Sequence, residues 1–363
     1  MKIALFLQGK STPSTRFRIL QYLQRFSDAG IECTCFYPII PKYGFVPQFL
    51  PGKRPRQLFR SITQWFFYLP HRWWQIRQAR LHEYDAVILQ KQLSIRPTGA
   101  YLEEMITRRN KNIALDLDDA EFTNPAALDS AKSQAALLRV SELAIKVVVC
   151  NQYLADAATH TPSKVVILPT TVDERRYLPA LSSKSTKPCI GWTGSASTLR
   201  YLRLVLPALE AVIEKTGASL VVISDQIWVD WLSHIPGIRF VKWNEEDEIS
   251  QLQSIDIGIM PLTDDTWTQG KCAFKIIQYM AIGIPTVASP VGMNCEVTID
   301  GKTGYLVRSH DEWVGTLCTL VESEYLRKEM GGLARRHFME HFSSATVASA
   351  WIELMRNLAL PQS

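Results

Sequence analysis

The sequence lacks the features of membrane-spanning, zinc-ribbon and disordered proteins. Its first apolar run, residues 3–7, is too short for the core of a signal peptide, and no later run approaches the length of a membrane span. None of its seven cysteines belongs to a Cys-x2-Cys pair, and there is no internal repeat. A hydrophobic content of 47% excludes disorder. We therefore expect a packed, cytoplasmic protein with reduced thiols.

Length and patterning predict two α/β domains. The 363 residues suit two cores of ordinary size. Short apolar runs typical of strands alternate with stretches of helical periodicity, six in each half of the chain: 2–7, 33–37, 86–89, 113–117, 147–149 and 165–168, then 189–192, 220–223, 238–241, 255–260, 286–288 and 305–307. This alternation indicates parallel sheets, and six strands are typical of a doubly wound, Rossmann-like domain.

Composition locates the border between the domains. Pro169 closes the last strand of the first half, and residues 179–188 form a polar linker bounded by prolines. We predict a first domain over 1–175 and a second over 176–344, with a final helix over 345–363. Two such domains facing each other would leave a cleft at the carboxyl ends of their strands, where open α/β folds bind ligands.

Two loops that follow strands are candidate phosphate sites. Thr193, Gly194 and Ser195 lie between a strand and an apolar helix over 199–206, where backbone amides and the helix dipole favour an anion. The alternative is an ordinary helix cap without a ligand. After the first strand come Gly9 and then, at a helix start, Arg16 and Arg18, which are suited to a diphosphate or are merely solvated. An ATPase P-loop is disfavoured because Ala4 replaces its first glycine.

Residues 270–296 carry the most specific pattern. A short helix ends at Gly283, and Pro285 begins a buried strand. Lys271, Lys275 and Gln278 are spaced i, i+4 and i+7, which predicts one helix face with two ammonium groups and an amide. Such a face suits phosphates and a sugar hydroxyl.

This segment resembles the nucleotide-sugar site of GT-B glycosyltransferases, most closely family 4, with its Lys-x2-Glu-Tyr-Met-Ala-x-Gly-x-Pro pattern. The resemblance extends to residues 14–18, 115–119, 190–195 and 300–306. It implies that the second domain holds a nucleoside-diphosphate sugar, with Asn294 and Glu296 beside its sugar or ribose, and that the first domain holds the acceptor. It also implies transfer with retention of configuration, no required metal or other cofactor, and a final helix that packs back on the first domain.

The chain departs from this family pattern at several positions. Gln278 and Gly270 stand where family members place a Glu-x7-Glu pair, and Trp192 and Ser197 replace the usual arginine and lysine of the first donor loop. An amide can still hydrogen-bond ribose. We expect Lys271 and Lys275 to supply the missing diphosphate charge.

An acidic cluster follows the strand over 113–117. Asp116, Asp118 and Asp119 repel one another unless they are solvated or bind cations, so the cluster is a candidate site. By the resemblance, Asp118 falls where many related enzymes carry a histidine that contacts the transferred sugar, and Asp119 supports the loop or acceptor. Alternatives are a GT-A-type metal pair, a phosphatase whose motif is broken at Ala120, and a cluster that caps a helix.

No acidic residue occurs between Glu32 and Glu83. This interval holds arginines and aromatics that favour an anionic membrane surface or lipid-linked acceptor: Arg60, Trp65, Phe66, Trp73 and Trp74. The alternative is packing of the aromatics on the first domain. The net charge of +5 is mild and no recognised nucleic-acid module is present, so we expect no nucleic-acid partner.

The sequence thus predicts a metal-independent glycosyltransferase of the hexosyltransferase type. We expect it to act on a glycan or lipid-linked acceptor during assembly of a surface glycan or glycolipid, in the cytoplasm or peripherally on the inner face of the membrane. A nucleotide-sugar epimerase of the same fold and a non-catalytic sugar-nucleotide-binding protein are the alternatives.

Overall fold

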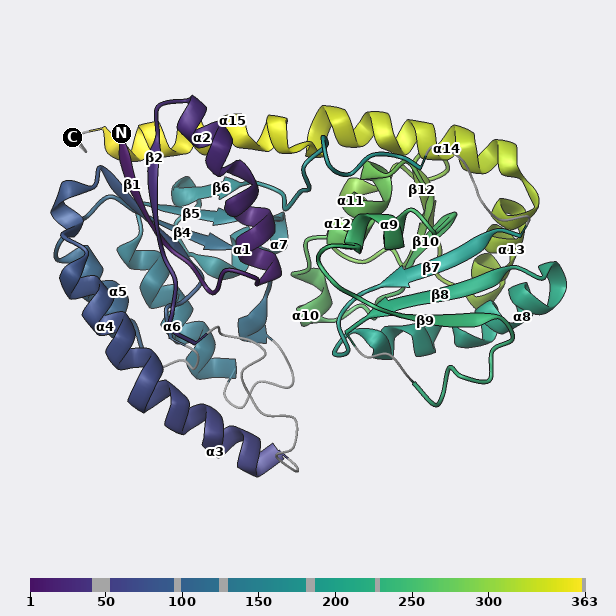
Figure 1. The fold of residues 1–363 in the computed structure, drawn as a ribbon, viewed down its shortest axis with the longest axis horizontal. Helices are drawn as coiled ribbons and strands as arrows, with labels where there is room; N and C mark the ends of the chain where they lie inside the picture. The colour runs from purple at the N-terminus through teal and green to yellow at the C-terminus, as the bar shows by residue number, and fades with distance from the viewer. Residues whose placement is uncertain (41–52, 95–98, 124–129, 181–186, 226–228, 361–363) are drawn as a thin grey trace. The chain divides into compact units, whose positions relative to one another are not determined.

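The computed structural model describes residues 1–40, 53–94, 99–123, 130–180, 187–225 and 229–360. The chain divides into two compact units: unit 1 is Met1–Thr170 with Val347–Ser363, and unit 2 is Thr171–Thr346. Each unit contains a six-stranded parallel sheet with helices around it (Figure 1). The predicted fold class of two doubly wound α/β domains is confirmed.

The sheet of unit 1 has the strand order β2-β1-β3-β4-β5-β6. Its strands are β1 (Lys2–Phe6), β2 (Glu32–Phe36), β3 (Ala86–Gln90), β4 (Ile113–Leu117), β5 (Lys146–Val149) and β6 (Val165–Ile167). All pairs are parallel; Ile3, for example, pairs with Cys33 on one side and Ala86 on the other. The inner strands are buried on both faces, which is why they form continuous apolar runs in the sequence.

Helices surround this sheet, and a segment from the end of the chain joins its core. The helices are α1 (Pro13–Arg18), α2 (Leu23–Asp28), α3 (Lys53–Thr63), α4 (Leu69–Gln78), α5 (Tyr101–Thr107), α6 (Ser130–Leu143), α7 (Gln152–Ala158) and α15 (Ser344–Ala359). Val347, Trp351 and Leu354 of α15 belong to the same core cluster as Ile3 and Leu5 of β1. Burial of this apolar stripe holds the part of α15 from Val347 onward within unit 1.

The sheet of unit 2 has the strand order β12-β11-β10-β7-β8-β9. Its strands are β7 (Cys189–Thr193), β8 (Ser219–Ser224), β9 (Ile238–Lys242), β10 (Ile257–Met260), β11 (Thr286–Ala288) and β12 (Gly304–Leu306). Its helices are α8 (Leu206–Thr216), α9 (Glu248–Leu252), α10 (Thr266–Gln269), α11 (Phe274–Ala281), α12 (Met293–Val297), α13 (His310–Glu322) and α14 (Glu324–His337).

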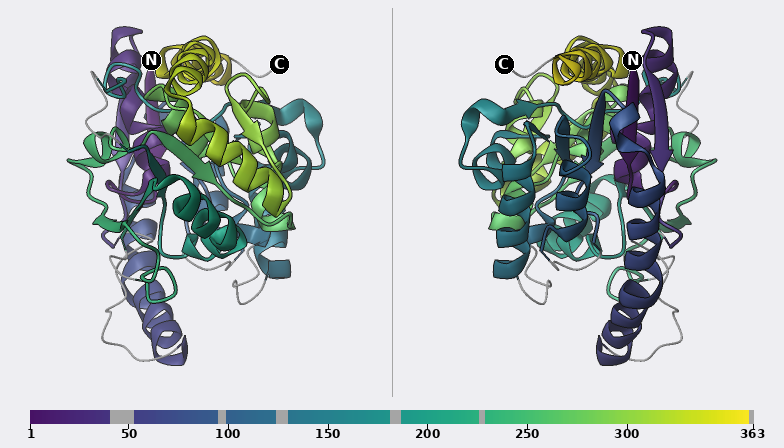
Figure 2. Two further views of the ribbon diagram at one scale, coloured as in Figure 1. Left: turned by 90° about the vertical axis from the view of Figure 1, so that its right-hand side faces the viewer. Right: turned by 90° about the vertical axis from the view of Figure 1, so that its left-hand side faces the viewer.

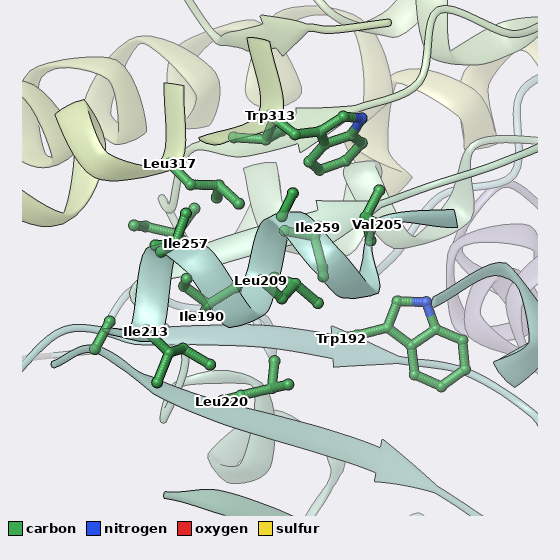
Figure 3. Packing of buried hydrophobic residues seen from close by; sticks show 14 of the residues in the cluster. Ile190, Trp192, Val205, Leu209, Ile213, Leu220, Ile257, Ile259, Trp313 and Leu317 are labelled. Carbon is green, nitrogen blue, oxygen red and sulfur yellow. The ribbon is translucent and has the colours of Figure 1, made fainter. Parts of the chain in front are cut away.

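The core of unit 2 lies between its sheet and the helices α8 and α13. Leu209 and Ile213 of α8 and Leu317 of α13 pack with Ile190 and Ile257 of the central strands (Figure 3). This packing fixes β7 and β10 side by side, and thereby fixes the loops at their carboxyl ends. Among the described residues, no helix combines the length and apolar character needed to cross a bilayer.

Candidate functional site

The strand order of unit 2 places a change of direction between its two central strands, β7 and β10. From β7 the chain runs outward to β8 and β9 on one side, whereas β10, β11 and β12 extend the sheet on the other. Connections therefore diverge where β7 and β10 meet. In open α/β sheets, ligands bind outside the carboxyl ends of the strands at such a point. The loops after β7 and β10 form this edge of unit 2, which we call the donor edge.

The loop after β7 is tight around Gly194. A Cβ atom at this position would lie 2.7 Å from the Trp192 ring and 2.9 Å from Cε of Lys275, so the lysine side chain runs close to the glycine backbone. Thr193 N–H donates to the Tyr279 hydroxyl at 3.2 Å and Gly194 N–H to the Ile223 carbonyl at 3.0 Å. These two amides have internal partners, which argues against the predicted amide cradle.

The rest of this loop also differs from the prediction. Ala196 N–H donates to Asp225 Oδ1 at 2.7 Å, and the Ser195 and Ser197 hydroxyls are hydrogen-bonded at 2.8 Å. A 3-10 helix, Leu199–Leu204, follows the loop, and α8 begins only at Leu206. The expected apolar helix over 199–206 is thus a 3-10 helix that ends at Leu204, and the α-helix begins two residues later. Because a single short 3-10 segment carries a smaller dipole than a long α-helix, side chains are the main source of positive charge here.

Three cationic side chains lie against the aromatic rings of the donor edge. Lys275 Nζ is 5.4 Å from the ring centroid of Trp192, and Lys271 Nζ is 4.0 Å from that of Trp267. Arg200 Cζ is 5.0 Å from the same Trp267 ring. Arg200 was not among the predicted site residues, although its place in the first turn after a strand-end loop was a usable signal. The rings orient the cations without neutralising their charge. Arg200 Nη2 also donates to the Tyr201 hydroxyl at 3.1 Å.

The predicted single face of Lys271, Lys275 and Gln278 does not form. Lys271 precedes α11, because Ala273 has a left-handed backbone with φ of 46° and the helix begins at Phe274. Gln278 is buried, and its Nε2 donates to Glu248 Oε1 at 3.1 Å. This buried contact argues against the predicted hydrogen bond from Gln278 to ribose. Lys271 and Lys275 remain at the donor edge on two different segments.

Two further predicted donor residues lie on α12, after β11. Asn294 is buried, and its Nδ2 donates to the Ser289 carbonyl at 3.0 Å, which braces the turn before the helix. Glu296 is exposed. Partial burial of its carboxyl group nevertheless raises the pKa of Glu296 above its ordinary value. Of the two side chains, Glu296 is the one available to a ligand.

Unit 1 has a corresponding edge where β1 and β3 meet. The loop that contains Gly9 is held by Thr12, whose hydroxyl donates to the Gly9 carbonyl at 2.9 Å. The Thr15 hydroxyl donates to Gln90 Oε1 at 2.5 Å, and Gln8 Nε2 donates to the Gln90 carbonyl. These buried bonds tie the loop after β1 to the end of β3 and fix the backbone around Gly9.

Asp118 lies at this same edge, one residue beyond the end of β4, in an ion pair that the sequence did not reveal. Its Oδ1 is 2.8 Å from Lys91 Nζ, which is also 2.8 Å from Glu121 Oε1. Lys91 has a left-handed φ of 58°, a conformation that strains a non-glycine residue. Burial alone would raise the pKa of Asp118, but Lys91 and a hydrogen bond with Ser14 hold it below its ordinary value. Asp118 is thus an ionised, preorganised carboxylate, with the half-buried Asp119 beside it.

Arg18 does not occupy the predicted place beside an anionic ligand. Its guanidinium is buried, lies 2.5 Å from Asp116 Oδ1, and also donates to the Leu168 carbonyl. Arg16 is buried too, with Cζ 4.7 Å from the Phe17 ring centroid. The environment of Arg18 therefore argues against the diphosphate role that we predicted for it.

The same ion pairs weaken the alternative of a metal-binding Asp-x-Asp motif. Asp116 and Asp118 each have a cationic partner of their own, Arg18 and Lys91. A divalent cation would have to displace both. In the part of the chain that the structure describes, no group of three histidine, cysteine, aspartate or glutamate side chains could hold a metal ion.

The predicted membrane or acceptor surface lies on α3, on α4 and on the π-helical turn Gln64–Tyr68 between them. Trp65, Phe66, Trp73 and Trp74 are all exposed there. Trp65, Phe66 and Trp74 are therefore at least half exposed, whereas Trp73, 38% exposed, lines a pocket with Tyr101 and Met105 of unit 1. Arg60 belongs to α3, but its side chain lies outside the described residues.

Two Rossmann-like units in one chain, each with a parallel sheet whose strand order changes direction near its centre, define the class as the GT-B fold. Two solved structures share this fold. HepE of Anabaena in complex with UDP and glucose has a TM-score of 0.69 and 15% identity, and the match covers 98% of this chain and 100% of HepE. Sucrose-phosphate synthase of Thermosynechococcus elongatus has a TM-score of 0.70 and 15% identity, and the match covers 98% of each chain. At these identities the likeness shows the fold.

Sequence comparison finds a known family pattern within unit 2. Residues 187–323 match the family described as glycosyl transferases group 1. A D-inositol 3-phosphate glycosyltransferase of Paenarthrobacter aurescens is 30% identical over 109 residues, which is 30% of this chain and 25% of the relative. The match thus spans about a quarter of that relative. The chain has the fold of GT-B glycosyltransferases, and unit 2 carries the sequence pattern of their group 1.

Proposed function

We propose that the protein transfers a sugar, of the hexose type, from a nucleoside diphosphate to an acceptor hydroxyl with retention of configuration. The observation that carries the proposal is the set of three cations, Arg200, Lys271 and Lys275, at the strand-end edge of unit 2. All three lie inside the segment that matches the group 1 family. The structural relative HepE binds UDP and glucose, which supports a sugar nucleotide as the ligand class.

The proposed chemistry centres on the leaving diphosphate. As the bond between the sugar and the phosphate oxygen breaks, negative charge grows on the diphosphate. Lys275 beside Gly194 and the Lys271 and Arg200 pair on Trp267 are suited to stabilise that charge without a metal or other cofactor. Glu296 is the proposed partner of a donor hydroxyl. Burial raises the pKa of Glu296 because it disfavours the ionised carboxyl group, and a hydrogen bond donated by a ligand hydroxyl would stabilise that ionised form.

We assign the acceptor to unit 1, where Asp118 is the proposed contact. A carboxylate held ionised by Lys91 accepts hydrogen bonds from sugar hydroxyls well, but is a weak base. Its proposed role is therefore orientation of the transferred sugar or acceptor, with Asp119 supporting the loop. The proposed acceptor is a glycan or a lipid-linked sugar. We also propose that the protein acts in the cytoplasm, since all seven cysteines are free thiols.

The test begins with nucleotide binding. Melting of the full chain is followed with UDP, GDP, ADP, CDP and dTDP, each with and without Mg²⁺. A ligand at a hundred times its Kd stabilises the protein by about 2.7 kcal/mol. Lys275→Ala should weaken binding about 10- to 100-fold through loss of a charge-assisted hydrogen bond, whereas Lys302→Ala on an exposed turn of unit 2 should leave it unchanged. Absence of stabilisation by every nucleotide would refute the donor site.

Turnover separates the proposal from a binding protein without catalysis. The buried contact between Gln278 and Glu248 favours that second candidate, since it occupies the amide expected to hold ribose. The donor whose nucleotide stabilises the protein is incubated with enzyme, and release of nucleoside diphosphate is measured by mass spectrometry. Release that is lost in Lys275→Ala supports a transferase. Binding without release over days supports a non-catalytic protein, and a change of sugar stereochemistry without an acceptor supports an epimerase.

A further inference from the structure

A long exposed apolar face runs along one helix of unit 1. α3, the π-helical turn and α4 form one continuous helix, whose α3 end extends beyond the strands of the unit (Figures 1 and 2). Large apolar side chains on this helix are exposed over about 40–70% of their surface: Leu58 63%, Ile62 46%, Trp65 60%, Phe66 72%, Phe67 57%, Trp73 38% and Trp74 54%. Contiguous apolar exposure of this extent marks an interaction site.

The opposite face of the helix holds this surface in place. Tyr68, Arg72 and Ile76 recur every four residues and are fully buried. Arg72 Nη1 donates to the Phe36 carbonyl at 3.1 Å, and Nη2 donates to the Leu7 carbonyl. These bonds attach α4 to the ends of β1 and β2. Because the buried side fixes the rotation of the helix, the aromatic side is presented to solvent by the fold itself.

Positive charge borders the same face. Trp73 and Arg77 of α4 line a pocket of about 520 Å³ together with Tyr101, Met105, Arg108 and Arg109 of α5 and the turn after it. The lining contains three arginines and no carboxylate. Arg77 Cζ lies 4.5 Å from the ring centroid of Trp73, so the basic pocket and the aromatic face meet at that residue. A pocket of this composition is suited to a phosphate group.

We propose that this face docks unit 1 on an anionic lipid bilayer, with Trp65, Phe66, Phe67 and Trp74 in the interface and the arginine pocket holding a lipid phosphate. Aromatic side chains beside basic ones match the boundary between headgroups and acyl chains, where rings are partly buried and arginines meet phosphates. Because the three arginines of the pocket are positively charged, an anionic bilayer is favoured over an uncharged one. This inference is independent of the sugar transfer proposed above.

The experiment is co-sedimentation of the full chain with vesicles. Vesicles of phosphatidylcholine alone are compared with vesicles that also contain phosphatidylglycerol. The wild type should bind the anionic vesicles more tightly. Substituting Arg77, Arg108 and Arg109 with glutamine should weaken that binding about five-fold per arginine, and on the order of a hundred-fold together. A matched triple variant in unit 2, Lys215→Gln with Lys302→Gln and Arg336→Gln, makes the same charge change and should bind as the wild type does.

The aromatic contribution is tested separately. Trp65→Ser with Phe66→Ser and Trp74→Ser should reduce binding by about ten-fold per side chain. The control in unit 2 replaces the exposed side chains Ile299, Tyr325 and Met339 with serine. Since these positions are on the surface, the melting temperature should hardly change. Quenching of wild-type tryptophan fluorescence by brominated lipid, reduced by Trp65→Phe with Trp74→Phe, gives a readout that does not depend on the serine variants.

Four outcomes would overturn the proposal. Wild-type protein that does not bind anionic vesicles excludes a bilayer. Vesicle binding that both triple variants of unit 1 retain excludes this face. Binding of inorganic phosphate that the arginine variant loses, without any effect on vesicles, makes the pocket a site for a soluble anion. A dimer that dissociates in the aromatic variant, together with absent vesicle binding, makes the face a contact with a second copy of the chain.

Discussion

Replacing Arg18 with methionine should destabilise unit 1 strongly while leaving nucleotide binding intact. Arg18 and Asp116 form a buried ion pair at 2.5 Å, and both side chains are at most 1% exposed. Methionine fills much of the arginine volume but leaves the Asp116 carboxylate buried without its cation. Breaking such a pair on one side costs about 3–5 kcal/mol.

The magnitude translates into a large change in melting temperature. For a domain of 150–250 residues, each kcal/mol lowers the melting temperature by about 2–4 °C, so Arg18→Met should lower that of unit 1 by roughly 6–20 °C. The double variant Arg18→Met with Asp116→Leu removes both charges, and replacing a buried ion pair with apolar residues is often neutral or stabilising. The double variant should therefore recover most of the loss.

The assay combines melting curves with nucleotide titrations on Arg18→Met and on the double variant. Arg18→Lys is the matched control, because it keeps one positive charge but loses the guanidinium bond to the Leu168 carbonyl. A single variant that melts with the wild type but loses affinity for nucleoside diphosphate would refute our reasoning. That result would restore the role that the sequence suggested for Arg18.

Three further predictions concern the donor edge of unit 2 and the strand ends of unit 1. Gly258→Ala should cost about 1–3 kcal/mol of stability, since its Cβ would lie 2.3 Å from the Tyr279 ring; Gly315→Ala, which meets nothing within 4 Å, is the control in melting experiments. Glu296→Gln should raise the melting temperature at neutral pH, because burial disfavours the ionised carboxyl group, while it lowers turnover; a lower melting temperature would contradict this. Asp118→Asn should reduce the loss of stability on acidification. The lowered pKa of Asp118 stabilises the fold at pH values above the ordinary aspartate pKa of about 3.9, and this stabilisation disappears as the pH falls through the pKa of the folded state. Parallel curves of stability against pH for the variant and the wild type would count against the ion pair.

The strands were predictable from the sequence because burial on both faces makes a parallel strand a continuous apolar run. The predicted runs over 113–117 and 286–288 match β4 and β11 at both ends, and the other strand predictions differ by one or two residues. The helix after β7 was not predictable in the same way. Its apolar pattern fits an α-helix as well as a 3-10 turn followed by one, and tertiary packing decides between them.

Polar residues were harder to assign because their partners are distant in sequence. Arg18 and Asp116 are 98 positions apart, and Gln278 and Glu248 are 30 apart. A single sequence shows that an arginine or an amide is present, but not whether a remote carboxylate neutralises it. Local position in the sequence suggested a ligand for both residues, and the fold gives each of them an internal partner instead.

Lys91, which directly follows β3, could not be predicted as a site residue for the same reason. Nothing in its local sequence signals a buried cation, since the two carboxylates that it meets follow a different strand. Only the adjacency of β3 and β4 brings the lysine to Asp118. The strained backbone of Lys91 persists because two ion pairs hold the side chain, which connects a local conformational cost to the electrostatics at this edge of unit 1. A carboxylate cluster in a Rossmann-like domain is therefore best read together with the residues that end the neighbouring strand.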